Sequence, residues 1–341
     1  MSSMTHQFSR IALNAKGAAR ISFSGVFAVV LLAAVGLGFV FRQELLDQIK
    51  LYNYTAPAAI VDLANQNGFQ PDARRVFYVN HPMLQDKTTF TSACPNGGGE
   101  KTIILGCYHG NQNGIFLLKV SDSRLNGVTQ VTAAHEVLHA AYDRLSNSER
   151  KELDTMLLDY YRKELKDQRI IDTIEGYKKS EPLDVVNEMH SIFGTEIAKL
   201  PPALEKHYQQ YFIDRSKVIG YANQYQNEFT SRQAAIKEDD VQLAIVKQRI
   251  EAGEVNLTAQ QSQITSRQQQ LVALRRSGDT AGYNAGVPGY NAAIDSYNSQ
   301  VRQVQSLVAQ YNQLVAARNE LAAQISELSN ALSTNATMIN N

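Results

Sequence analysis

The feature that most limits how this chain can fold is a hydrophobic repeat in its C-terminal third, in which apolar residues recur at every seventh position. A repeat of this period is typical of a coiled-coil seam. Two such repeats are separated by 277–289, which is rich in Gly and contains Pro288, a residue that cannot continue a helix. We therefore predict an antiparallel coiled-coil hairpin over 216–335. The first seam carries Leu243, Ile250, Leu257, Ile264 and Leu271, and the second carries Ile294, Val301, Val308 and Val315.

Polar and small residues interrupt both seams, so the predicted hairpin says little about function. Gly253, Gln260, Arg267 and Arg318 occupy positions that a tight dimerisation coil fills with Leu or Ile. Two interpretations fit this composition. The hairpin is either a spacer or packing arm, or an arm that binds a protein partner.

An uncharged apolar run of 21 residues covers 21–41. At about 1.5 Å per residue, a helix of this length matches a hydrocarbon core about 30 Å thick. A cleaved signal peptide is the alternative, but its apolar region is usually about 7 to 15 residues long. We therefore predict one transmembrane helix over 21–41.

The charges that flank this run differ on its two sides. Arg10, Lys16 and Arg20 precede it with no acidic residue, whereas the charges over 42–50 balance. Positively charged segments stay on the cytoplasmic side of a membrane. A single-pass membrane protein is thus predicted, with residues 1–20 in the cytoplasm and the remainder in the extracytoplasmic space.

The only two cysteines, Cys94 and Cys107, lie in that outer part and flank a Pro-Asn-Gly-Gly-Gly segment. A local disulfide is expected for such a pair in an oxidising compartment, and two unpaired thiols are the alternative.

Between the apolar run and the hairpin, the hydrophobic patterns predict a small antiparallel or mixed sheet followed by helices. This arrangement is an α+β body over 55–215. A helix begins near Pro57 and ends at Gly68, and Ser146 with Glu149 forms a capping box before a later helix. The other expected elements are strands at 75–79, 101–108 and 115–120, with the last two joined by an Asn-Gln-Asn-Gly turn, and helices at 128–145, at 150–161 and from Pro182 onward.

The chemistry of the chain is indicated by the sequence His-Glu-Val-Leu-His at 135–139. Histidines at positions i and i+4 lie on the same face of a helix, where both imidazoles can bind one zinc ion. Glu136 is then placed to act as a general base toward a water molecule at the metal. Two unrelated histidines of an amphipathic helix are the alternative, but the preceding hairpin and a downstream carboxylate favour the zinc site.

Zinc in a catalytic site takes three protein ligands and keeps one position open. The positions of the Gly and third His of metzincins hold Tyr142 and Leu145 here, which excludes that family. The segment 187–195 resembles the Asn-Glu-x-x-Ser-Asp-Ile-Phe-Gly segment of thermolysin-like peptidases, so the chain resembles the gluzincins. That resemblance implies Glu188 as the third ligand. The Asp that orients a zinc histidine in that segment is missing here. Glu196 is either a rival zinc ligand or takes the place of that Asp by accepting a hydrogen bond from a ligand imidazole.

The same resemblance implies zincin-type active-site helices and the hydrolysis of peptide bonds. It extends to bacterial membrane proteins that carry both motifs, and it gives no substrate. Gluzincins stabilise the oxyanion with a His or Tyr from across the cleft, for which His207, Tyr208 and Tyr211 are candidates. The strand at 115–120 is expected at the cleft, where it could pair with an extended substrate.

We therefore predict a membrane-anchored zinc metallopeptidase that acts on peptides or proteins. The alternatives are a non-catalytic envelope scaffold that binds a partner through the hairpin, and an amidase of cell-wall peptides. Basic and acidic residues are equal in number, 33 of each, so no excess positive charge is available to bind nucleic acid.

Overall fold

The computed structural model describes residues 31–32, 35–37, 41–95 and 104–334. The chain forms two units, residues 1–55 and 56–341. In the first unit, helix α2 (Arg42–Leu51) contains ten residues and carries charged side chains at Arg42, Glu44, Asp47 and Lys50. The described residues contain no helix that is both long and apolar enough to cross a bilayer.

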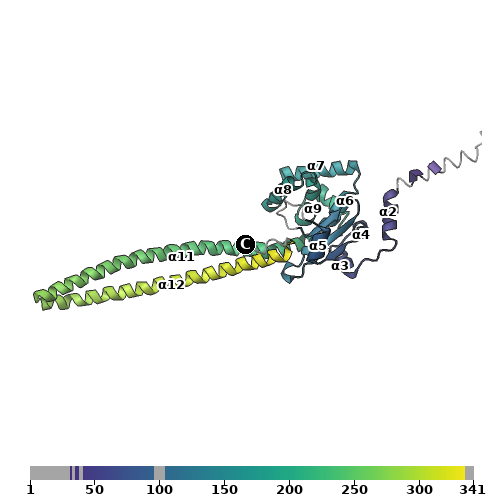
Figure 1. The fold of residues 1–341 in the computed structure, drawn as a ribbon. Coiled ribbons are helices and arrows are strands. Elements are labelled where there is room, and N and C mark those ends of the chain that lie inside the picture. The colour runs from purple at the N-terminus through teal and green to yellow at the C-terminus, as the bar shows by residue number, and fades with distance from the viewer. Residues whose placement is uncertain (1–30, 33–34, 38–40, 96–103, 335–341) are drawn as a thin grey trace, which may run out of the picture. The chain divides into compact units, whose positions relative to one another are not determined.

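The predicted fold class, with a transmembrane helix at 21–41, is therefore wrong for the part of the chain that the structure describes. Most of 21–41 lies outside the described residues. Helix α2, which follows that segment, has ten residues and spans about 15 Å, only half of a hydrocarbon core. The second unit is mainly helical and contains one small sheet (Figure 1).

The sheet has three strands, β1 (Met83–Gln85), β2 (Gly106–His109) and β3 (Gly114–Leu118), in the order β1-β3-β2. β3 is central, parallel to β1 and antiparallel to β2. The predicted turn does join β2 to β3, with Asn111 and Gln112 at positive φ. The strand expected at 115–120 is therefore the middle strand, and β1 and β2 are the two outer strands of the sheet.

One expected strand is a helix. Residues 75–79 belong to α4 (Pro71–Val79), which Pro71 begins. Its buried residues Ala73, Val76 and Phe77 follow the three- and four-residue spacing of a helix rather than the alternation of a strand.

Helices surround the sheet and form the main core. α6 (Val128–Tyr142) lies among them and contacts α3, α4, α9, α11, β2 and β3. α7 begins with the capping box of Ser146 and Glu149, as predicted. The bounds of the remaining body elements are Ala58–Gln66 (α3), Lys87–Ala93 (α5), Ser123–Leu125 (η1), Asn147–Lys163 (α7), Gln168–Ser180 (α8), Val185–Glu196 (α9) and Pro202–Tyr208 (α10).

Two long helices, α11 (Ser216–Ser277) and α12 (Thr280–Leu332), lie side by side as an antiparallel hairpin (Figure 1). The turn between them is only Gly278 and Asp279, much shorter than the break predicted over 277–289. Gly278 ends α11 in the left-handed conformation, and the Asp279 carboxylate caps α12. Pro288 lies inside α12 on its exposed face, where the missing N–H leaves a carbonyl open to water.

The base of the hairpin belongs to the body. Val218 and Ala222 of α11 are fully buried, and the α12 residues Leu328 and Leu332 pack with Leu125 and Val128. Gly127, just before α6, approaches so close that a Cβ there would lie 2.6 Å from the carbonyl oxygen of Tyr221. Both ends of the hairpin are therefore held against the first turn of α6.

Candidate metal centre

Two helices of the body bring the predicted metal ligands together. His135 and His139 lie one turn apart on α6, and Glu188 lies in the first turn of α9, which packs against α6. The Nε2 atoms of the two histidines are 3.0 Å apart. Glu188 Oε2 lies 3.5 Å from His135 Nε2, and Oε1 lies 3.3 Å from His139 Nε2. His139 and Glu188 are buried, and His135 is half-buried.

These separations fit a single small cation. Ligands about 2.0 to 2.1 Å from a tetrahedral zinc ion lie about 3.3 Å from one another. The three separations in the structure fall between 3.0 and 3.5 Å. Two imidazole nitrogens and one carboxylate are also a donor set typical of zinc. The group His135, His139 and Glu188 can therefore hold a metal ion.

The charges of these groups support one another. Burial alone would lower the pKa of His135, but the hydrogen bond and the negative charge of Glu188 outweigh it and raise that pKa to about 9. Burial would raise the pKa of Glu188, yet the neighbouring histidines lower it below its usual range. A proton and a metal ion thus compete for the same cluster.

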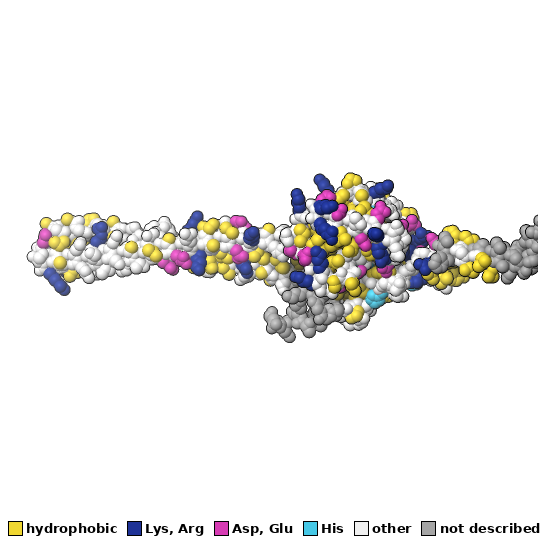
Figure 2. Space-filling view, turned by 90° about the horizontal axis from the view of Figure 1, so that it is seen from above, with side chains coloured by type: hydrophobic (Ala, Val, Ile, Leu, Met, Phe, Trp, Pro, Cys, Tyr) yellow, Lys and Arg dark blue, Asp and Glu magenta, His cyan; other side chains and the backbone are white. Residues whose placement is uncertain are grey.

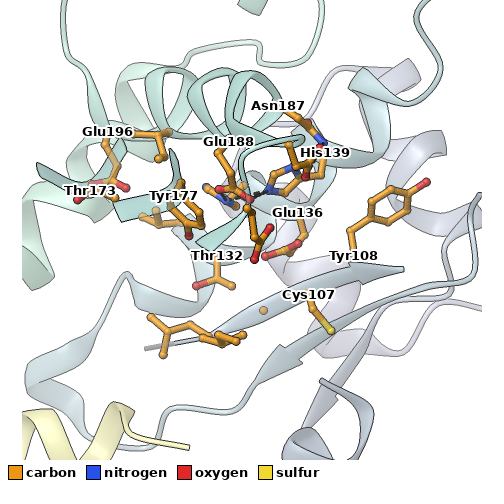
Figure 3. Close-up of a pocket in the computed structure, with 18 of the residues that line it drawn as sticks. Cys107, Tyr108, Thr132, Glu136, His139, Thr173, Tyr177, Asn187, Glu188 and Glu196 are labelled. Atoms are coloured by element: carbon orange, nitrogen blue, oxygen red, sulfur yellow. Dashed lines mark hydrogen bonds and ion pairs between the residues drawn. The ribbon is translucent and has the colours of Figure 1, made fainter. Parts of the chain in front are cut away.

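Glu136 lies beside this group without belonging to it. The side chain is buried, and burial raises the pKa of its carboxyl group. The backbone N–H of Tyr108 donates a hydrogen bond to the carboxylate. Figure 3 shows Glu136 between the metal-binding group and the strand that carries Cys107 and Tyr108. The carboxylate is therefore held at the boundary between the donors and β2.

Gly106 makes this close approach possible. A Cβ at Gly106 would lie 2.7 Å from Glu136 Oε1 and 2.5 Å from Thr132 Cγ2. Cys107, which follows Gly106 in β2, forms a disulfide with Cys94 at the end of α5. This bond ties β2 to α5. Strand β2 is thus fixed against α6 at the position where Glu136 reaches it.

The donors open into a cleft of about 400 Å³. β2 and α6 form one side of it, and α8 and α9 form another, with Tyr225 of α11 also in the lining. The Tyr177 hydroxyl on α8 donates a hydrogen bond to Glu188. The cleft therefore joins a metal-binding group, a buried carboxylate and a strand edge.

The structure places Glu196 at this cleft but away from the imidazoles. Its Oε2 atom accepts hydrogen bonds from Arg169 (2.6 Å) and Gln226 (2.8 Å). Glu196 is not part of the metal-binding group that the described residues form. Asp184, one turn before Glu188, also lines the cleft and is close enough to His139 for their charges to interact.

The three candidates for oxyanion stabilisation lie elsewhere in the body. His207 Nε2 is 3.0 Å from His190 Nε2, and the Tyr208 hydroxyl donates to the His190 carbonyl. Tyr211 packs against both histidine rings. None of the three lines the cleft around the metal-binding group.

Among the cleft residues that belong to no sequence motif are Gly106, Tyr177 and Tyr225. Gly106 carries a sequence signal only as a Gly in an expected strand, which indicates a close backbone approach. Tyr177 and Tyr225 belong to helical segments whose neighbours in space are set by tertiary packing.

No family model, curated protein or solved structure matches this chain. The fold and the site define a mainly helical protein with a candidate His-His-Glu metal centre.

Proposed function

We propose that this protein is a zinc-dependent peptidase that hydrolyses peptide bonds, with Glu136 as general base. The observation that carries the proposal is the buried Glu136 carboxylate next to a group of three metal donors. A structural zinc site takes four protein ligands, whereas a catalytic site takes three and leaves one position open. Within the described residues the group offers three.

Zinc, when bound, would act as a Lewis acid that polarises a carbonyl and lowers the pKa of water. The residues of the chain do the remaining work. Glu136 removes the proton from the attacking water and later delivers it to the leaving amine. Its raised pKa suits a group that must both take up and release a proton near neutral pH. The Tyr108 N–H keeps the carboxylate oriented toward the cleft.

The outer edge of β2, which lies at the cleft, supports a peptide as the substrate class. Leu118 N–H donates to the Leu105 carbonyl, 2.9 Å away, so Leu105 faces β3. Because peptide groups alternate along an antiparallel strand, those of Gly106 and Tyr108 face away from β3. Gly106 lines the cleft. The Tyr108 N–H is already bound to Glu136. The peptide groups of Gly106 and the carbonyl of Tyr108 could therefore form the backbone hydrogen bonds by which an extended substrate adds to β2.

The test uses the purified full chain, stripped of metal with a chelator and reloaded with zinc. Fluorogenic peptide libraries, denatured proteins and cell-wall peptides are the substrates. We expect zinc-dependent hydrolysis of peptides, and its loss in Glu136→Gln protein that still binds one zinc per chain. The amide preserves the shape of the side chain but cannot take a proton.

Zinc binding without hydrolysis of any of these substrates would overturn the peptidase and favour a site that only holds the helices together. Cleavage confined to cell-wall peptides would instead identify an amidase. Unchanged turnover in Glu136→Gln protein would exclude Glu136 as the base.

A further inference from the structure

The two ends of the cleft differ in chemistry. Asp184 lies one turn before Glu188 on α9 and lines the cleft together with His139, so the beginning of α9 and the end of α6 form its polar end. Glu181 and Asn187 line the cleft at this polar end. In Figure 3, Asn187 and His139 lie on one side of the site, and Thr173 and Glu196 lie on the other.

Apolar residues line the end near Glu196. Val131 precedes His135 by one turn of α6, and Ile192 follows Glu188 by one turn of α9. Each therefore lies about 6 Å along its helix from a metal ligand. Leu105 joins them from the segment before β2. A side chain next to the scissile bond has the reach to enter this space.

Tyr225 of α11 stands at the same end of the cleft. Gln226 donates to Glu196 (2.8 Å) and lies 3.5 Å from the Tyr225 hydroxyl, and Arg169 donates to Glu196 from α8. Helices α8, α9 and α11 are thus tied together around Tyr225. Behind it, the ring packs against the cluster of Leu125, Val128, Leu328 and Leu332 at the base of the hairpin.

The charges at this end cancel. Arg169 and Glu196 form an ion pair of 2.6 Å. Burial raises the pKa of Tyr225 to about 12, so its phenol is neutral at pH 7. A charged substrate group that entered here would lose water without gaining a partner, which is unfavourable. An apolar side chain would bury its surface against Leu105, Val131 and Ile192.

We propose that Tyr225 closes this end of the cleft and selects substrates with an apolar side chain beside the scissile bond. The inference rests on the proposed peptidase function. It assigns to the base of the hairpin a direct part in substrate selection, because Tyr225 is contributed by α11.

The test compares fluorogenic peptides that differ only in the residue beside the cleaved bond: Ala, Leu, Phe, Lys or Asp. The zinc-loaded wild type should prefer Leu to Lys and Asp by at least about tenfold in kcat/KM, as expected for an apolar pocket. Tyr225→Ala lengthens the pocket and should shift the preference from Leu toward Phe by about tenfold. Tyr225→Phe should leave the preference unchanged.

Tyr297→Ala is the matched control, since it removes a half-buried tyrosine from the hairpin seam. Tyr225→Leu keeps an apolar contact with the hairpin base and replaces Tyr225→Ala if that variant does not fold. A second readout is calorimetric binding of the same peptides to zinc-loaded Glu136→Gln protein, in which the order of affinities should follow the order of kcat/KM.

A wild type that cleaves no peptide overturns the proposed function, and this inference with it. A wild type that cleaves peptides, but whose preference is the same in Tyr225→Ala and Tyr225→Leu protein, overturns this inference alone. A wild type that prefers Lys or Asp beside the cleaved bond also overturns this inference alone.

Discussion

Helix α6 and the hairpin are both long helical segments, but they bury their residues very differently. Twelve of the 15 residues of α6 are buried, against six of the 62 residues of α11. Four alanines of α6 allow neighbouring elements to pack closely on every side. On the face seen in Figure 2, hydrophobic side chains of the hairpin are interspersed with polar ones. We infer that function is concentrated in the body and at the hairpin base.

The two regions offer a matched pair of arginines. Arg215 is buried, pairs with Glu205 and donates to the carbonyls of Ile197 (2.6 Å) and Ala198 (3.3 Å) after the end of α9. Arg318 in the hairpin pairs with Asp240 at 2.9 Å; Asp240 is exposed and Arg318 is half-buried.

Arg215→Met should lower the free energy of unfolding by about 3 to 5 kcal/mol, because it leaves buried acceptors without a donor. Arg318→Met should cost less than about 1 kcal/mol. Urea denaturation of the full chain, followed by circular dichroism, measures both. Equal losses of unfolding free energy in the two variants would contradict the contrast between body and hairpin.

The second prediction concerns the metal donors. His135→Ala, His139→Ala and Glu188→Ala should each weaken zinc binding by more than about 100-fold, since even changes to residues that only hydrogen-bond a metal ligand cost about 10- to 100-fold. Competition with a chelating dye measures the affinity. His109→Ala removes an exposed histidine at the end of β2 and should leave it unchanged. Stoichiometric zinc in His139→Ala protein would refute the ligand assignment.

A third prediction compares two glycines. Gly106→Ala should reduce kcat/KM by about 10- to 100-fold while zinc stays bound, because the new methyl group displaces Glu136 and small displacements of a catalytic group are costly. Gly253 in the hairpin has its own close neighbour, Val304 Cγ2, 2.6 Å from a Cβ built there.

Gly253→Ala is the control for this test. The added methyl group crowds Val304, which should lower the free energy of unfolding by about 1 to 3 kcal/mol. The higher helix propensity of Ala offsets about 1 kcal/mol of this loss. Turnover should not change. Peptidase assays at saturating zinc distinguish the two variants, and equal activity in both would remove Gly106 from the site.

The contrast also shows what the sequence could predict. Patterns that repeat locally were sufficient for the hairpin seams, the capping box of α7 and the β2–β3 turn, because adjacent residues determine them. The spacing of His135 and His139 likewise placed both donors on one helix face, and the later carboxylate motif identified Glu188.

Features that depend on distant packing were not predictable in this way. The β-branched and aromatic residues at 76–79 suit the strand expected at 75–79 locally, but Pro71 and the packing of Phe77 against Phe69 hold the segment in a helix. His207, Tyr208 and Tyr211 follow α9 closely in sequence, yet they pack around His190 rather than along the cleft. Tyr225 reaches the cleft from a segment assigned to the hairpin.

The smallest predicted effect tests the seam itself. Gln260 of α11 occupies a seam position, and its side-chain oxygen is buried with no hydrogen bond among the described residues. A buried acceptor without a donor costs about 1 kcal/mol or more. Gln260→Leu should therefore stabilise the hairpin by about 1 kcal/mol. Hydrogen exchange of the amides near residue 260 measures this locally, without requiring the whole chain to unfold in one step.

Gln269 lies on the exposed face of the same helix, and Gln269→Leu is the control, expected within about 0.5 kcal/mol of the wild type. Sedimentation of both variants separates stability from association, because a polar residue in a seam can also prevent pairing with a second chain. Slower exchange in a monomeric Gln260→Leu protein would show that the hairpin carries an unsatisfied polar group in its seam. Unchanged exchange would mean that the seam accommodates the amide as readily as Leu, and that burial in the hairpin is too shallow to distinguish the two side chains.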